Sequence, residues 1–309
     1  MEAIRNTPLG LITVYEGYDP EIDIVAVHGL GARPEWAWTR RVEAPGGKMK
    51  EVKWLSDPNL LPARLPRSRV MTFNYESRWH RNAPKHRKTS VADNLLRCLE
   101  EQRQNNPRVR NRPLLFIGHS YGGIVIEQLI VHTLHREIGY IRKATAGIVF
   151  LGTPHRGTDV QSWGELMAVM GQKMGLGSHN EILKELRADS ENLKDMSSAF
   201  SRWVNRASVP IVCGVELYET DYGKRLGGIL PMKAMVVPED SACIDGHPRL
   251  YLYEDHLKLN KYCGPNDSSY RAVSSQLVDM ALTAIPTVRG RFGRTQPTSY
   301  RLPPNGRKR

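Results

Sequence analysis

The amino-acid sequence predicts an α/β protein built on a mainly parallel sheet with helices on both faces. Two observations support this class: apolar runs of strand length recur along the chain, and helical patterns lie between them. Parallel strands are covered on both faces, so they read as apolar runs rather than as alternating patterns. The 309 residues are enough to bury a sizeable core around one such sheet.

The expected elements alternate between strand and helix through the first half of the chain. Helices are expected over 90–102, where the apolar residues share one face, and over 121–135. Thr89 or Ser90 would cap the first of these helices. The eight expected strands are residues 11–15, 22–27, 69–75, 113–118, 147–152, 209–217, 233–237 and 249–253.

Residues 158–205 interrupt this alternation with two or three helical patterns, which are expected to form a cap. Met167, Met170 and Met174 would give the cap a flexible apolar surface that suits an acyl pocket, although plain packing is the commoner reason for such a stripe. The sequence therefore predicts one domain over 1–286 that contains this cap. A basic, disordered tail or linker is expected over 287–309.

The formal net charge of +12 is unevenly distributed along the chain. Residues 287–309 hold seven Arg and Lys residues and no acidic one, and a second basic run covers 78–88. Such runs are usually solvated. They would also suit peripheral contact with an acidic membrane surface or, as the less favoured partner, nucleic acid.

The sequence has no apolar run near the ~18 residues that cross a bilayer and no secretory signal pattern. We expect an intracellular protein, either cytoplasmic or peripherally attached to the ER or mitochondrial membrane. The four cysteines, Cys98, Cys213, Cys243 and Cys263, have no C-x-x-C spacing, so neither a disulfide framework nor a zinc site is predicted. No third ligand accompanies His132 and His135, and the sequence predicts no metal and no cofactor.

The segment Gly118-His119-Ser120-Tyr121-Gly122 follows an apolar strand and opens a helical pattern. This context places a serine on a strained turn, with its hydroxyl exposed above the sheet. Gly118 and Gly122 fit because a side chain at either position would collide where strand and helix approach each other. Ser120 is therefore predicted to be a nucleophile.

A nucleophilic serine needs a base, and His256 lies three residues past the expected strand 249–253. The reaction also needs backbone N–H donors for an oxyanion. One would be the amide of Tyr121. The other would be the amide of Leu30, in the small-residue loop His28-Gly29-Leu30-Gly31 that follows an apolar strand.

Six segments together resemble the lipase-like serine esterase branch of the α/β-hydrolase superfamily: VAVHGLGA, FNYESRW, FIGHSYGGIVIEQ, IVFLGTPHRGTD, VPEDSA and DHLKLNKY. The chain is most similar to the domain at the N-terminus of fungal NOD-like receptors and in serine-active-site lipase-like proteins of mitochondria and the ER. GPI inositol-deacylases are more distant. The resemblance covers residues 9–285 and implies an eight-stranded sheet, Ser120 and His256 as catalytic residues, and ester or lipid acyl bonds as substrates. His155 in LGTPHRG is expected to be structural.

The carboxylate that orients the histidine is the least determined part of the site. Glu219 is favoured because it follows the expected strand 209–217 and catalytic loops gather at the ends of parallel strands. A Glu-Thr pair here is also usual in the resembled branch. The alternatives are Glu216 inside the strand, Asp221, and the pair Glu239 and Asp240 nearer to His256.

The sequence thus predicts a serine hydrolase that cleaves carboxylic esters of small molecules or lipids through an acyl-enzyme on Ser120. Phospholipase, inositol-deacylase and acyl-transfer activities share the same nucleophile. The alternative is a signalling, effector or scaffold domain, with a downstream domain or partner protein, in which the hydrolase fold has weak or no catalysis.

Overall fold

A seven-stranded sheet runs through the centre of the molecule in the order β1-β5-β2-β6-β7-β8-β11. The computed structural model describes residues 8–32, 34–75, 77, 87–104, 106–135, 139–155, 190–221 and 233–293. β1 is antiparallel to β5, and every other neighbouring pair in this sheet is parallel. The strands are β1 (Gly10–Glu16), β2 (Ile22–Val27), β5 (Ser68–Asn74), β6 (Leu114–His119), β7 (Thr145–Leu151), β8 (Ile211–Tyr218) and β11 (Arg249–Asp255).

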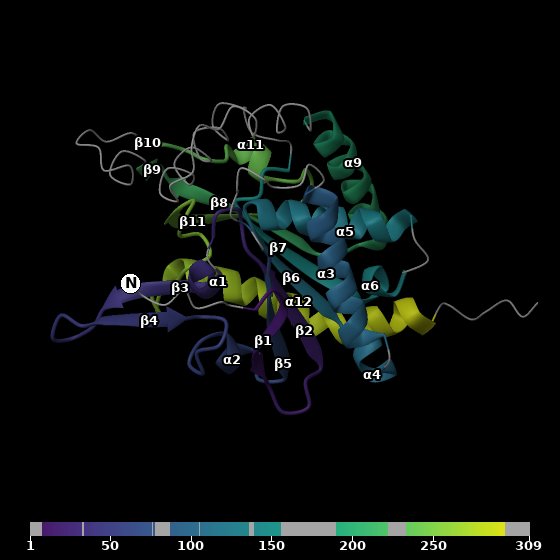
Figure 1. Ribbon diagram of the computed structural model, residues 1–309, viewed down its shortest axis with the longest axis horizontal. Helices are drawn as coiled ribbons and strands as arrows, with labels where there is room; N and C mark the ends of the chain where they lie inside the picture. The colour runs from purple at the N-terminus through teal and green to yellow at the C-terminus, as the bar shows by residue number, and fades with distance from the viewer. Residues whose placement is uncertain are drawn as a thin grey trace, which may run out of the picture.

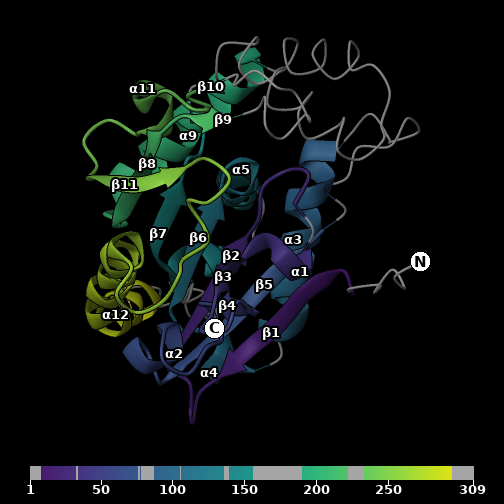
Figure 2. The same cartoon turned by 90° about the vertical axis from the view of Figure 1, so that its left-hand side faces the viewer.

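The two faces of the sheet bury two separate cores, and side chains alternate between them along each strand. In β2, Val25 and Val27 face the core that contains residues of α3 (Arg87–Arg103), α5 (Tyr121–His135) and α9 (Ser190–Ala207). Ile24 and Ala26 face the core built with α12 (Ser268–Gly293). Figures 1 and 2 show α12 on one side of the sheet and α3, α5 and α9 on the other.

The remaining elements are α1 (Pro34–Ala37), α2 (Leu61–Arg64), α4 (Pro107–Arg110), α6 (Gly139–Ala144), α11 (Glu239–Ala242) and strands β3 (Thr39–Glu43), β4 (Met49–Lys53), β9 (Thr220–Asp221) and β10 (Lys233–Ala234).

Seven of the eight expected strands lie in this sheet, but the prediction for 233–237 is wrong. Only Lys233–Ala234 is extended, and it pairs with Thr220–Asp221 outside the main sheet. β11 pairs directly with β8, which leaves no place between them for a further strand. Val236 and Val237 are buried, and their N–H groups donate to a side chain described below instead of to a strand ladder.

A hairpin that the sequence did not predict supports the edge of the fold. β3 and β4 pair antiparallel between β2 and β5 in the chain. The buried Trp54 follows this hairpin and donates its indole N–H to the main-chain oxygen of Asn260 at 2.9 Å. Its ring packs edge-on against Tyr262 with centroids 5.0 Å apart. Residues 39–54 thus brace the segment that follows β11.

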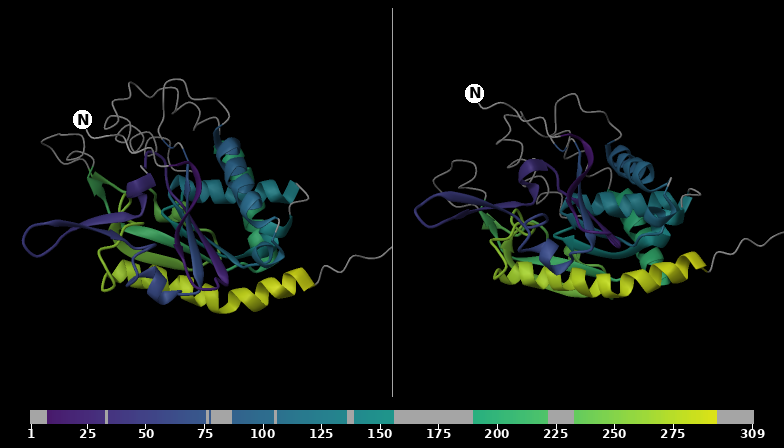
Figure 3. Two further views of the ribbon diagram at one scale, coloured as in Figure 1. Left: turned by 60° about the horizontal axis from the view of Figure 1, so that its bottom comes forward. Right: turned by 90° about the horizontal axis from the view of Figure 1, so that it is seen from below.

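The C-terminal boundary of the domain lies beyond residue 286, so the expected tail over 287–309 begins too early. α12 continues to Gly293, and Val288 is buried. Arg291 donates to the main-chain oxygens of Thr145 and Ala207, at 2.5 and 3.0 Å. Two arginines counted as tail residues therefore belong to the folded helix, which lies along the sheet in Figure 3. Residues 294–309 lie outside the described residues.

The expected cap is described only in its last part. Residues 156–189, with the three methionines, lie outside the described residues, as does most of the basic run 78–88. α9 covers the rest of the cap sequence, and its Phe200 and Val204 are fully buried in the core shared with α5. This helix is a layer of the domain itself and not a separate cap.

A mostly parallel sheet with an antiparallel first edge strand, helices on both faces and a serine on the turn after the central strand is the α/β-hydrolase fold. The predicted fold class is confirmed, and the described residues contribute seven strands to the main sheet, where the resemblance implied eight. None of the described helices combines the length and apolarity that crossing a membrane requires.

Candidate active site

Ser120 lies on a sharp turn between β6 and α5. Its φ of 54° is in the left-handed region, which costs a residue with a side chain energy and is characteristic of a nucleophile elbow. A Cβ at Gly122 would lie 2.1 Å from the main-chain oxygen of Val27, and one at Gly118 would lie 2.7 Å from the Cα of Gly123. Both glycines are therefore required, as predicted, because backbone occupies the space that a side chain would need.

His256 follows β11 and reaches the serine. Its Nε2 lies 3.0 Å from Ser120 Oγ, across 136 positions of sequence. Gly152, at the end of β7, makes room for the imidazole, since a Cβ there would lie 3.1 Å from its Cε1 and Nδ1. Ser120 and His256 are 2% and 0% exposed. The structure therefore brings these two predicted residues together in a buried, low-dielectric setting.

Glu216, near the end of β8, completes the contact chain. Its Oε2 lies 3.0 Å from His256 Nδ1, and both side chains are fully buried. Its Oε1 accepts hydrogen bonds from the N–H groups of Val236 and Val237, at 2.6 and 3.0 Å. A carboxylate only accepts, so Nδ1 carries the imidazole proton, and Nε2 is free to accept from the Ser120 hydroxyl.

The structure places Glu216, and not the favoured Glu219, against the histidine. β8 is buried through Glu216, but its last two residues are exposed, and Glu219, which follows the strand, is exposed to solvent as well. Asp221 lies in the small β9–β10 sheet, and Glu239 instead pairs with Arg249 and Tyr251. The available signal was an acidic residue inside an apolar strand, because a buried carboxylate requires a partner.

The loop after β2 lies directly against the serine. A Cβ at Gly29 would be 3.0 Å from the Cβ of Ser120. His28 Nδ1 donates to the Gly29 carbonyl oxygen at 2.9 Å, and Tyr75 donates its hydroxyl to the His28 carbonyl oxygen at 2.7 Å. The peptide bond from Gly29 to Leu30 is trans, so its C=O and N–H groups point in opposite directions. The hydrogen bond from His28 to the Gly29 carbonyl oxygen therefore also fixes the direction of the Leu30 N–H.

The His28 side chain is neutral near pH 7. Burial lowers its pKa to about 4, against smaller opposing effects of its bond to Gly29 and of Glu35. Its ring stacks on Tyr75 with centroids 4.5 Å apart and an angle of 3° between the planes. Gly31 continues the loop with a φ of 68°, a conformation that favours glycine. His28, Gly29 and Gly31 therefore each contribute to the shape of this segment.

His155 is structural, as the sequence predicted, although its buried partner was not foreseen. Its Nδ1 contacts the Glu127 carboxylate in the middle of α5, and its main-chain N–H donates to the Ser241 carbonyl oxygen at 2.8 Å. Burial opposes the charge on His155, but Glu127 raises its pKa to about 9, with a contribution from Cys213. A buried ion pair thus joins the helix after Ser120 to α11.

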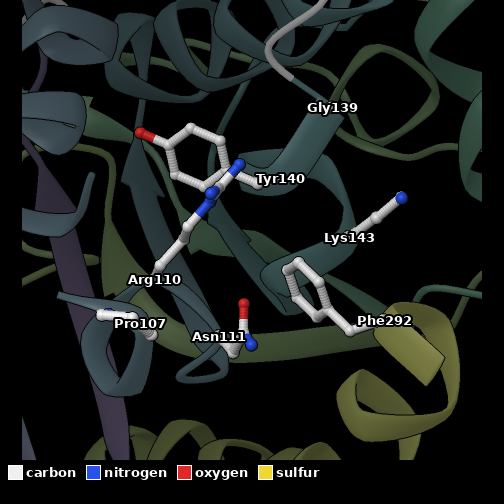
Figure 4. A pocket seen from close by; sticks show the side chains of 7 residues that line it. All are labelled: Pro107, Arg110, Asn111, Gly139, Tyr140, Lys143 and Phe292. Carbon is white, nitrogen blue, oxygen red and sulfur yellow. The ribbon is translucent and has the colours of Figure 1, made fainter. Parts of the chain in front are cut away.

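Two of the cavities among the described residues are not lined by Ser120. One, of about 380 Å³, is lined by residues of α4, α6 and the last turn of α12, and Figure 4 shows Arg110 over the Tyr140 ring and Lys143 near Phe292. α4 and α6 precede β6 and β7, so this cavity is at the end of the sheet opposite to Ser120. The other, of about 490 Å³, lies between α9 and residues 243–245. Over the described ranges, no group of three His, Cys, Asp or Glu side chains is arranged to hold a metal ion.

Comparisons with known proteins give distant likenesses. No family model matches the chain. The chain is 25% identical to Protein SERAC1 of Bos taurus over 251 residues and 24% identical to Protein SERAC1 of Danio rerio over 253 residues. Each match covers 77% of this chain but only 36% of the relative, so the chain spans about a third of the length of these curated relatives.

Among solved structures, the lipase BlEst2 of Bacillus licheniformis in its mature form is similar, with a TM-score of 0.49 and 14% sequence identity. This likeness covers 90% of this chain and 97% of that one.

Proposed function

We propose that the protein is a serine hydrolase that cleaves carboxylic esters through an acyl-enzyme on Ser120. The observation that carries this proposal is the continuous series of contacts from Ser120 Oγ through His256 to Glu216, each at 3.0 Å. A hydroxyl, an imidazole and a carboxylate in this order make a serine nucleophilic at neutral pH.

In the acylation step, His256 Nε2 takes the proton of Ser120 Oγ while Oγ bonds to the ester carbonyl carbon. The imidazolium that forms is stabilised by the Glu216 carboxylate at Nδ1. When the ester C–O bond breaks, Nε2 returns the proton to the leaving alcohol, and the acyl group remains on Ser120. Water then repeats the sequence, with its proton going to Nε2 and then to Ser120 Oγ as the acid departs.

The oxyanion of each tetrahedral intermediate would be bound by the amides of Leu30 and Tyr121. Support for Leu30 comes from the loop geometry: a Cβ at Gly29 would meet Ser120, so the loop passes beside the nucleophile, and His28 fixes the orientation of the peptide that carries the Leu30 N–H. Tyr121 begins the 15-residue helix α5, whose N-terminal dipole favours negative charge at this position. The donors would thus be in place before the charge develops.

The test is turnover of p-nitrophenyl esters of increasing acyl length, with short-chain phospholipids as a second series. Ser120→Ala should reduce kcat/KM by on the order of 10³-fold or more. Ser198→Ala, an exposed serine on α9, is the matched control and should leave it unchanged. The preferred chain length would identify the ester class, for which the resemblance implies lipid or other acyl esters. Turnover by Ser120→Ala at the wild-type rate would reject Ser120 as the nucleophile, and a folded wild-type protein that turns over none of these esters would favour the scaffold alternative.

A further inference from the structure

His119, the residue before Ser120, makes a contact with the catalytic histidine that the reaction steps above do not use. It is the last residue of β6 and is 6% exposed. Its Nε2 lies 2.8 Å from the main-chain oxygen of His256. A carbonyl oxygen only accepts, so Nε2 carries the proton of this imidazole and donates it.

This bond gives His256 a third attachment. Glu216 contacts its Nδ1, Ser120 contacts its Nε2, and His119 holds its carbonyl oxygen. Because His119 and Ser120 are consecutive residues of one turn, the same rigid piece of backbone holds the nucleophile and the main chain of its base. The backbone after β11 therefore cannot shift away from Ser120 without breaking the bond to His119.

The other edge of the His119 ring lies beside the oxyanion loop. Nδ1 would be 3.4 Å from a Cβ at Gly29. Within the described part of the chain, Nδ1 is buried and has no hydrogen-bond partner. The imidazole thus fills the space between the Gly29 segment and the His256 segment, and only one of its nitrogens is used for bonding.

We propose that His119 is a positioning residue, which keeps His256 within hydrogen-bond reach of Ser120 by donating Nε2–H to the His256 carbonyl. The proposal rests on the serine hydrolase function proposed above. It assigns His119 to the chemical step and not to substrate binding, because its hydrogen bond is to the main chain of the base.

The electrostatics around His119 agree with this role. Burial lowers its pKa well below the usual range, and His256, Lys261 and His28 lower it further, against the effect of the bond to the His256 carbonyl. His119 is therefore neutral when His256 becomes an imidazolium. A cation at position 119 would oppose that charge, because the two ring centroids are 5.3 Å apart.

The experiment compares His119→Leu, which removes the donor, with His119→Gln, whose side-chain amide keeps an N–H at a similar reach. Matched controls are His132→Leu and His132→Gln, because His132 on α5 pairs with Asp93 and touches no residue of the triad. Each variant is assayed for kcat and KM on one p-nitrophenyl ester, for the rate of labelling by a fluorophosphonate, and for thermal unfolding.

The expected result is that His119→Leu lowers kcat and the labelling rate by roughly 10- to 100-fold, with KM within about twofold. His119→Gln should recover most of this loss, and both His132 variants should retain wild-type kcat. If His119→Leu does not fold, His119→Asn replaces it, since its shorter amide cannot reach the carbonyl and the same loss is expected. Wild-type kcat in folded His119→Leu or His119→Asn, or a loss in folded His119→Gln equal to that in His119→Leu, would overturn the positioning role. A wild-type protein that neither turns over esters nor labels would instead reject the proposed function.

Discussion

Glu216 Oε2 lies 3.0 Å from His256 Nδ1, and the other oxygen of the same carboxylate is held by two backbone N–H groups. The carboxylate is therefore fixed in one orientation before it meets the imidazole. Fixed hydrogen-bond geometry of this kind determines which nitrogen carries the proton, and thereby whether Ser120 faces a base.

Replacing Glu216 with Gln is expected to lower kcat by roughly 10³-fold or more, because an amide N–H in place of the carboxylate favours the wrong tautomer of His256. Glu219→Gln is the matched control, three residues away and exposed, and should keep wild-type kcat. Steady-state kinetics on one ester decides between them. A large loss of kcat in Glu219→Gln with wild-type kcat in Glu216→Gln would instead identify Glu219 as the carboxylate that orients His256.

Because Gly122 is in close contact with backbone, adding one methyl group at this position should lower the unfolding free energy strongly. Gly122→Ala would place a Cβ 2.1 Å from the Val27 carbonyl oxygen, so β2 and α5 must separate. We expect a loss of several kcal/mol in unfolding free energy, measured by urea denaturation. Gly290→Ala on α12, where a Cβ meets nothing within 4 Å, is the control and should stabilise by up to about 1 kcal/mol. Equal effects of the two substitutions would contradict the packing described here.

Acid should destabilise the fold through His28. Its pKa is about 4 in the folded protein and 6.5 in the unfolded chain, so between these pH values the unfolded state binds more protons. Stability from this group is complete above pH 6.5 and decreases as the pH falls towards 4, by roughly 3 kcal/mol in all. His119 acts in the same direction. Denaturant titrations at pH values from 7 to 4.5 give the unfolding free energy as a function of pH. This free energy should decrease less steeply with falling pH in His28→Asn than in wild type. An equal decrease in both proteins would contradict a neutral, buried imidazole.

Alkali should act in the opposite direction through His155. Glu127 raises its pKa to about 9 despite burial, so the folded state binds the extra proton between pH 6.5 and 9. This contribution is complete below pH 6.5 and is lost as the pH rises towards 9. Glu127→Gln removes the charge that holds the proton, and its unfolding free energy should vary less over this range than that of wild type. A variant as sensitive to alkali as wild type would exclude the ion pair as the cause.

Features encoded in short segments could be predicted from the sequence. The glycine spacing around Ser120, the small loop from His28 to Gly31 and the strand before His256 each depend on neighbouring residues, and the structure places all three as expected. Their meeting at one end of the sheet follows from parallel topology, because the carboxyl ends of parallel strands lie together.

Features that depend on contacts with residues far away in the sequence could not be predicted from the sequence. The orientation of the Glu216 carboxylate depends on hydrogen bonds from the N–H groups of Val236 and Val237, some 20 residues later. Because these N–H groups donate to a side chain, they are not available for a strand ladder in the sheet. The helical state of Arg291 depends on carbonyls of Thr145 and Ala207. Local propensity carries no information about such contacts, and a basic or apolar pattern alone therefore predicts the wrong element.

Intact-protein mass spectrometry after treatment with a fluorophosphonate shows whether Ser120 is an activated nucleophile. The wild-type protein should gain one adduct, which peptide mapping places on Ser120, and Ser120→Ala should gain none. An adduct of equal yield on Ser120→Ala, or a folded wild-type protein that gains no adduct, would mean that Ser120 is not an activated nucleophile.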